Sequence, residues 1–294
     1  MVHNIYKRWK NKKNKTKDIE STSRGYENNE VGEDVSNRIP PWEDTLNKNV
    51  LLSFVHIPKA GGTSLNGYLA QIYGRYMVKY HSYFNPTLFE ETTEVTAKEI
   101  LCISSHRGYG IHRLFGSKDP AKPLDNGDGL FAGRDIRYIT IIRNPLDRMI
   151  SYYNFVTTFP AHHHYDVVKE MDIYAFYEYL ESKNDPEYSN LQCYLITGRV
   201  SRSFEHAREL IDSKFFAAAP VERSNEFIQY LSLRMGWPKS VPYEVRNVSP
   251  KKVTSDKIDN NLKNFLLKHN NEDYKLYNYI ANKFEDDLEI LQNE

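Results

Sequence analysis

The chain has 294 residues, of which 40 % are hydrophobic and 13 % aromatic, enough apolar material for one substantial core. This content excludes a fully disordered or fibrous chain. Lys and Arg total 39 and Asp and Glu also total 39, so the formal charge is zero. A general coat for DNA or RNA needs a dominant basic excess and is therefore excluded. Cys102 and Cys193 are too few for a disulfide scaffold, although one bridge between them stays open.

Residues 1–49 form a polar lead-in that predicts little independent structure, and residues 50–294 are expected to form a single domain. The lead-in is basic from Lys7 to Lys17, which indicates either a solvated segment or contact with an anionic membrane or glycan. The sequence contains no apolar run near the ~18 residues that span a bilayer and no apolar signal segment. We therefore expect no transmembrane anchor and a cytoplasmic location.

Short apolar runs alternate with helical patterns after residue 49. Residues 50–57 are apolar and end at Pro58, which predicts a strand buried on both faces. A glycine turn at 60–64 follows, and then apolar residues at helical spacing over 65–73. The alternation predicts an α/β fold with a mostly parallel central sheet flanked by helices. The remaining expected elements are strands at 100–103, 138–142 and 215–221, a loop at 116–135, helices at 172–180, 202–210 and 225–235, and a mostly helical segment at 257–291.

The glycine turn has the layout of an anion site. Glycines let the backbone approach a phosphate closely, and the following helix N-terminus presents N–H groups and a positive dipole end. Lysine adds a mobile positive charge, and Thr and Ser add hydroxyl donors. An ordinary glycine turn is the alternative. The residues expected to surround a phosphate are Lys59, Ala60, Gly61, Gly62, Thr63 and Ser64.

The order of these residues differs from that of a nucleoside-triphosphatase P-loop, in which the lysine follows the last glycine. Lys59 precedes both glycines. A magnesium-dependent phosphotransferase also needs an acidic residue at a strand end, whereas Asp147 falls inside the next predicted helix. The pattern therefore favours nucleotide chemistry without a metal.

A second candidate phosphate-binding segment follows the strand at 138–142. Arg143 ends this strand, Asn144 can cap the helix behind it, and Ser151 lies about two turns into that helix. Arg148 could add a second guanidinium group, or the arginines could pair with local acids such as Asp147. Two phosphate-binding segments at the ends of neighbouring strands imply a ligand with two anionic groups.

Three segments resemble the sulfotransferases that use 3′-phosphoadenosine 5′-phosphosulfate (PAPS). Residues 54–65 are similar to that family's 5′-phosphosulfate loop, and residues 142–153 are similar to its 3′-phosphate motif R-x-P-x-x-R-x-x-S. Residues 103–110 resemble the segment in which the family has a histidine base. The likeness is closer to the carbohydrate branch, the heparan-sulfate-type O-sulfotransferases and their bacterial relatives. Weaker signatures fall at 190–192, 221–223, 247–249 and 273–277.

The resemblance implies a P-loop-like nucleotide-binding fold and in-line transfer of a sulfuryl group from PAPS to an acceptor hydroxyl of a carbohydrate. It assigns Lys59 and the glycine turn to the 5′-phosphosulfate, and Arg143 and Ser151 to the 3′-phosphate. Lys59 would stabilise the leaving phosphate and His106 would be the base, with His112 as the second candidate. No metal is expected in the reaction.

Other histidines and other functions stay open at this point. His56 lies within a predicted buried strand and is expected to be a core residue with a hydrogen-bond partner. Residues 162–164 are three consecutive histidines, for which a surface loop is the first interpretation, acceptor contact the second and a metal site the last. The alternative functions are a metal-dependent nucleotide kinase or phosphotransferase, and a non-catalytic module that binds 3′-phosphoadenosine 5′-phosphate (PAP) or a glycan.

Overall fold

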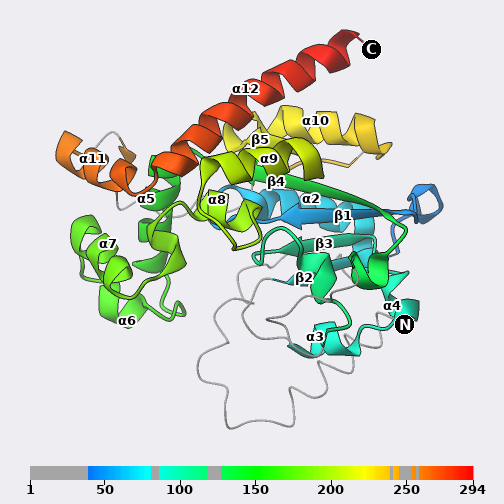
Figure 1. The fold of residues 1–294 in the computed structure, drawn as a ribbon, viewed down its shortest axis with the longest axis horizontal. Helices are drawn as coiled ribbons and strands as arrows, with labels where there is room; N and C mark the ends of the chain where they lie inside the picture. Colours follow the sequence, from blue (N-terminus) through cyan, green and yellow to red (C-terminus); the bar gives the residue numbers. More distant parts are fainter. Residues whose placement is uncertain are drawn as a thin grey trace.

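Five parallel strands form the central sheet, in the order β2-β3-β1-β4-β5 (Figure 1). The computed structural model describes residues 39–80, 86–117, 127–238, 241–244, 253–255 and 258–293. The predicted α/β class with a parallel sheet and flanking helices is confirmed. The strands are β1 (Val50–Val55), β2 (Met77–Tyr80), β3 (Cys102–Ser105), β4 (Asp135–Ile142) and β5 (Phe215–Pro220).

The burial of the strands explains which of them the sequence predicts. Every residue of β1 is buried, as are the last five of β4, because helices cover both faces of the sheet. The predicted strands at 50–57, 138–142 and 215–221 are confirmed. The strand predicted at 100–103 is shifted to β3, because the polar Ser104 and Ser105 are also buried in the sheet. The short edge strand β2 was not predicted.

The longer helices agree with the predicted ranges. The prediction that residues 257–291 are mostly helical is confirmed, and the segment consists of two helices that meet at His269 and Asn270. Short helices at 86–91, 94–97, 165–168 and 191–196 were not predicted. The helices are α2 (Gly62–Tyr73), α3 (Pro86–Glu91), α4 (Glu94–Ala97), α5 (Pro145–Val156), α6 (Tyr165–Val168), α7 (Ile173–Ser182), α8 (Leu191–Ile196), α9 (Phe204–Lys214), α10 (Ser224–Met235), α11 (Asn260–Lys268) and α12 (Asn271–Asn293).

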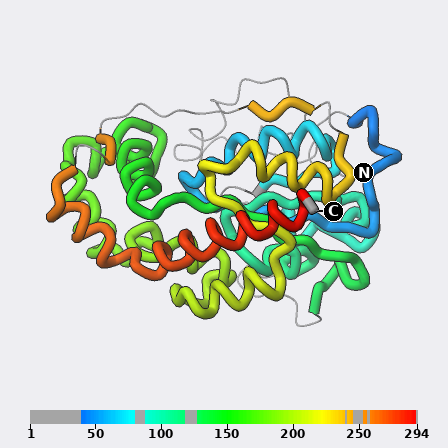
Figure 2. The backbone as a smooth tube through the Cα atoms, turned by 90° about the horizontal axis from the view of Figure 1, so that it is seen from above, coloured from blue at the N-terminus to red at the C-terminus, as the bar shows by residue number. Residues whose placement is uncertain are grey.

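Two helical layers enclose the sheet. Phe54 and Ile139 point to one face, where they pack with residues of α2 and α10. Val55 and Ile142 point to the other face, where they pack with residues of α8, α9 and α12. Figure 2 shows α12 running along the molecule beside α9 and α10. The alternation of side chains along each strand thus divides the apolar core between two layers.

A separate group of helices, α5, α6, α7 and α11, gathers at one end of the molecule (Figure 1). Its core joins Met149 and Tyr153 of α5 to Phe176 of α7 and Leu266 of α11. Because α5 follows β4 directly, this group lies beyond the carboxyl ends of the strands, where parallel α/β sheets bind ligands.

Part of the polar lead-in lies against the domain. The indole N–H of Trp42 donates a hydrogen bond to the carbonyl of Ile72 over 2.9 Å, and Leu46 is buried in the core. The basic run at residues 7–17 and positions 118–126 of the predicted loop lie outside the described residues. Cys102 and Cys193 are both buried and free, so they form no bridge. Among the helices that the structure describes, none has both the length and the apolar composition needed to cross a bilayer.

Candidate functional site

Lys59 and Arg143 meet at the carboxyl ends of two adjacent strands. The chain leaves β1 towards β2 at one edge of the sheet, and it leaves β4 towards β5 at the opposite edge. Such a reversal between neighbouring strands is the usual ligand position in open parallel sheets. Nη1 of Arg143 donates a hydrogen bond to the Lys59 carbonyl over 3.3 Å. The fold therefore brings together the two cationic residues that the sequence pattern singles out.

The two glycines of the turn pack so tightly that a side chain at either position would clash with a neighbour. A Cβ atom at Gly62 would lie 2.0 Å from the ring of His56, and one at Gly61 would lie 2.4 Å from the Val221 side chain. Gly61 also has a φ of 85°, in the left-handed region that favours glycine. The packing of the turn against His56 and Val221 therefore requires glycine at both positions.

The turn directs only some of its residues towards the site. Ala60 and Ser64 are buried, whereas Lys59 and Thr63 are partly exposed. Helix α2 begins at Gly62, and no side chain among the described residues caps its N-terminus. The N–H groups of this first turn and the Lys59 ammonium are therefore the donors that the turn offers to an anion.

Lys59 is held in an environment that disfavours its charge. Burial and, to a smaller extent, the nearby Arg143 guanidinium lower the pKa of Lys59 to about 8, although Glu187 acts in the opposite direction. Nζ of Lys59 lies 4.1 Å from the centre of the Phe155 ring, a cation–π contact. The φ of Lys59, 63°, is also left-handed, which is costly for a residue with a side chain. An anion beside Lys59 would stabilise its protonated form.

The backbone of Arg143 is fixed by a buried amide. Gln192, which is 0 % exposed, accepts a hydrogen bond from the Arg143 N–H and donates one to the Arg143 carbonyl, each over 2.9 Å. Asp273, also fully buried, accepts from the N–H groups of Gln192 and Cys193 at the start of α8. In return, Asn190 accepts from the N–H groups of residues 272 and 273 at the start of α12. The weak signatures at 190–192 and 273–277 thus form one network that positions Arg143.

Arg148 does not share the site with Arg143. It is 0 % exposed and its Nη1 donates to the Glu187 carboxylate over 2.6 Å, which neutralises both buried charges. The hypothesis that Arg148 adds a second guanidinium group to the phosphate site is therefore wrong. The partner is also not the local acid Asp147 but one 39 residues away.

Ser151 lies on the face of α5 that borders the glycine turn. Asp147, Ser151 and Phe155 are four residues apart and are all partly exposed, so they form one stripe along the helix. Lys59 contacts the end of that stripe at Phe155. Asn144 caps the helix as predicted, since its side chain accepts from the N–H of Leu146. No hydrogen bond that the described residues make joins Ser151 to Lys59 or Arg143.

His106 lies at the end of β3, next to the end of β1. Nδ1 of His106 donates to the His56 carbonyl over 2.7 Å, and the two imidazole rings lie 4.3 Å apart between centres. Burial lowers the pKa of His106 to about 4; Arg199 adds to this effect, whereas the bond to His56 opposes it. His106 is therefore neutral at neutral pH, with its ring lone pair on Nε2.

The other candidate histidines have different surroundings. His56 is buried and accepts a hydrogen bond from Asn66 over 3.1 Å, as expected for a core histidine with a partner, but it also contacts the site through His106 and Gly62. His112 is 2 % exposed, and its ring contacts Tyr138 on one side and Asp128, over 3.1 Å, on the other. Since both of its ring nitrogens are engaged there, His112 is the weaker candidate for a base.

Several residues that build the site were not assigned a role from the sequence. Phe155, Glu187, Gln192 and Asp273 act through contacts with residues far apart in the chain, and only the signatures around 190 and 273 hinted at two of them. Val221 of the signature at 221–223 packs against Gly61, and the signature at 247–249 lies outside the described residues.

One comparison with known proteins identifies a family for this chain. The sequence pattern of the family described as "Sulfotransferase family" matches residues 45–280, which is more than half of the chain and includes every candidate site residue. A comparison with curated proteins found no match. The chain belongs to the sulfotransferase family.

Proposed function

We propose that this protein transfers a sulfuryl group from PAPS to a hydroxyl group of a carbohydrate. The observation that carries the proposal is the contact between Lys59 and Arg143 at the switch point of the sheet. PAPS has phosphate groups at two ends of one adenosine, so it matches two cationic phosphate-binding segments at the ends of neighbouring strands. Lys59 and residues 60–64 then bind the 5′-phosphosulfate, and Arg143 and Ser151 bind the 3′-phosphate.

In the proposed transfer, the acceptor oxygen attacks the sulfur in line with the bond to the 5′-phosphate. The new S–O bond forms as the bond to the 5′-phosphate oxygen breaks, and PAP leaves. Lys59 and the N–H groups at the start of α2 stabilise the negative charge that develops on the leaving phosphate. The sulfuryl group carries less charge than a phosphoryl group, so these donors suffice without a metal.

His106 takes the proton of the acceptor hydroxyl. With a pKa of about 4, its imidazole is unprotonated at neutral pH, and its Nε2 can accept the proton as the S–O bond forms. The bond from Nδ1 to the His56 carbonyl supports this role, because it fixes the ring orientation and the tautomer.

The proposal of a carbohydrate acceptor is supported by the likeness of residues 54–65 to the carbohydrate branch of the family. We therefore propose a sugar hydroxyl rather than a small alcohol or a tyrosine as the group that accepts the sulfuryl group.

The test begins with ligand binding to the purified chain. PAP at 100 times its dissociation constant is expected to stabilise the folded state by about 2.7 kcal/mol, while ATP with magnesium gives a much smaller shift of the melting temperature. A larger shift with ATP and magnesium would instead indicate the phosphotransferase. Labelled sulfate from PAPS is then followed onto a panel of carbohydrates, small alcohols and tyrosine peptides.

Two variants test the assigned residues. Lys59→Ala and His106→Ala are expected to fold and to lose about 10²–10³-fold in turnover. Lys263→Ala, an exposed lysine of α11, and His206→Ala, on α9, are the matched controls. Binding of PAP without transfer to any acceptor would support the non-catalytic module, and full turnover by His106→Ala would exclude His106 as the base.

A further inference from the structure

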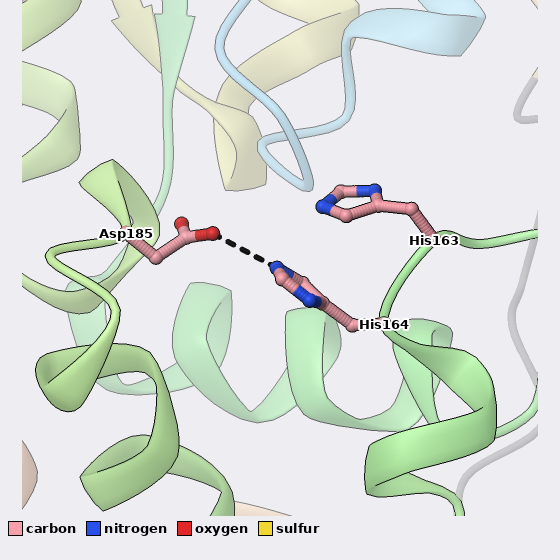
Figure 3. A group of neighbouring side chains, drawn as sticks. All are labelled: His163, His164 and Asp185. Atoms are coloured by element: carbon pink, nitrogen blue, oxygen red, sulfur yellow. Dashed lines mark hydrogen bonds and ion pairs between the residues drawn. The ribbon is translucent and has the colours of Figure 1, made fainter.

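Three metal-ligating side chains meet outside the proposed transfer residues. His163 and His164 lie between α5 and α6, and Asp185 precedes the short helix Pro186–Tyr188. One donor atom from each lies within 4.8 Å of the other two. Figure 3 shows the two imidazoles side by side on one loop, with the Asp185 carboxylate directed at His164 from the opposite side. Nε2 of His164 and Oδ2 of Asp185 are 3.0 Å apart.

These distances suit a small tetrahedral cation. Two donors that each lie about 2.0–2.1 Å from a zinc ion, at the tetrahedral angle, are roughly 3.3 Å from one another. His164 and Asp185 are already close to that separation. His163 is exposed and its ring lies beside that of His164, with the ring centres 3.9 Å apart, so a small rotation of its side chain is enough to direct a nitrogen at the same cation. Although adjacent histidines alone chelate poorly, Asp185 supplies a third donor from another part of the chain.

The groups behind two of the ligands hold them in place. The Tyr179 hydroxyl lies 3.3 Å from Nδ1 of His164 and can accept its proton, which leaves the Nε2 lone pair for a cation. Oδ1 of Asp185 accepts the N–H of Glu187 over 2.9 Å, so Oδ2 is the oxygen that faces His164. Nδ1 of the buried His162 accepts the N–H of His164 over 3.2 Å and anchors the loop. Outer contacts of this kind are typical of built metal sites.

We propose that His163, His164 and Asp185 bind one divalent cation of the zinc class, with a fourth coordination position open to solvent. Imidazole nitrogen selects zinc, cobalt, nickel and copper, whereas magnesium and calcium prefer all-oxygen sites. The proposal rests on the positions of these three side chains alone, so it does not depend on the proposed function.

The experiment measures binding of Zn²⁺ and Co²⁺ to the full chain by calorimetry, together with the absorption spectrum of the cobalt form. We expect one cation per chain with a Kd of about 10 µM or tighter, and the strong visible bands of four-coordinate cobalt. His163→Ala and Asp185→Asn are expected to weaken binding at least about 100-fold, and Tyr179→Phe about 10-fold. Asn at 185 can still accept the Glu187 N–H, so this variant keeps the local turn.

His206→Ala and the exposed Asp166→Asn are the matched controls and should bind the cation like the unaltered chain. Circular dichroism shows that each variant is folded, and His163→Ala, at an exposed position, provides the decisive comparison if a buried change disturbs folding. A Kd weaker than about 10 µM, unchanged binding in His163→Ala, or equal affinity for Mg²⁺ would overturn the proposal.

Discussion

The position of Arg143 depends on one buried amide, and the substitution Gln192→Leu tests this directly. Leucine has nearly the volume of glutamine, so the core stays filled, but it removes the donor and the acceptor that hold the Arg143 backbone. The N–H and the carbonyl of Arg143 then lose their partners in a partly buried position. Asp273 still caps α8 through the main chain, so the change is confined to the Arg143 contact.

The expected loss of stability follows from these two bonds. A buried polar group without a partner costs roughly 1–3 kcal/mol, so two fully buried groups would cost roughly 2–6 kcal/mol. Because Arg143 is only partly buried, we expect the lower part of that range, a decrease of about 2–4 kcal/mol in the free energy of unfolding. For a chain of this size the melting temperature falls by roughly 5–15 °C. PAP binding should weaken as well, because Arg143 loses its fixed direction.

Urea unfolding followed by tryptophan fluorescence measures the first effect, and a PAP titration measures the second. Gln71→Leu is the matched control, since Gln71 is partly exposed and makes only long bonds of 3.4 Å to Gly67 and Pro242. Its effect should stay below about 1 kcal/mol. If Gln192→Leu were no less stable than Gln71→Leu, the positioning of Arg143 by Gln192 would be refuted.

Three further predictions concern the same site. Burial lowers the pKa of His106 to about 4 and that of His162 to about 3. The free energy of unfolding is therefore expected to fall as the pH drops from 6.5 to 4.5, by roughly 2–3 kcal/mol for His106 alone. A free energy of unfolding in urea that stays constant over this pH range would contradict the prediction. Gly62→Ala should lower the melting temperature, because the added Cβ would clash with the His56 ring, and this cost exceeds the gain from the higher helix propensity of alanine. A higher melting temperature in this variant would exclude that contact. Lys59→Met should raise the free energy of unfolding by about 1–3 kcal/mol at pH 7, because burial lowers the pKa of Lys59 to about 8 and so makes its charged form costly. The gain should vanish above pH 10, where the lysine is neutral in both the folded and the unfolded chain. Lys263→Met is the control, and a loss of stability of Lys59→Met at pH 7 would argue against an electrostatic cost at Lys59.

The fold could be predicted where local pattern and burial coincide. Strand β1 is apolar on both faces, so its sequence alone indicates a buried parallel strand. Strand β2 has only four residues and includes Lys79, so it lacks that signal and depends on pairing with β3. The break between α11 and α12 has a long-range cause, because the buried Asn270 accepts the N–H of Asn190, eighty residues earlier. A helical pattern read along the chain does not contain this contact.

In the candidate site, too, some residues could be predicted from the sequence and others could not. Lys59 and Arg143 stand in short motifs next to strand ends, so spacing alone indicates that parallel strands bring them to one edge. Gln192 and Arg148 illustrate what spacing lacks. The partner of each lies 39 or more residues away, and only the tertiary structure determines whether a guanidinium faces a ligand or a buried carboxylate. Sequence patterns therefore indicate which residues gather, but not which of their charges stay available.

The charge at Lys59 is better explained by ligand binding than by folding. Its left-handed backbone, its buried ammonium and the neighbouring Arg143 each raise the free energy of the folded chain. Within the part of the chain that the structure describes, the Phe155 ring and the Glu187 carboxylate oppose these effects, and Glu187 already pairs with Arg148. The positive charge of Lys59 and Arg143 is therefore not balanced by these neighbours. An anionic group beside each of the two side chains would stabilise its positive charge, which is why we interpret this strained position as a phosphate site.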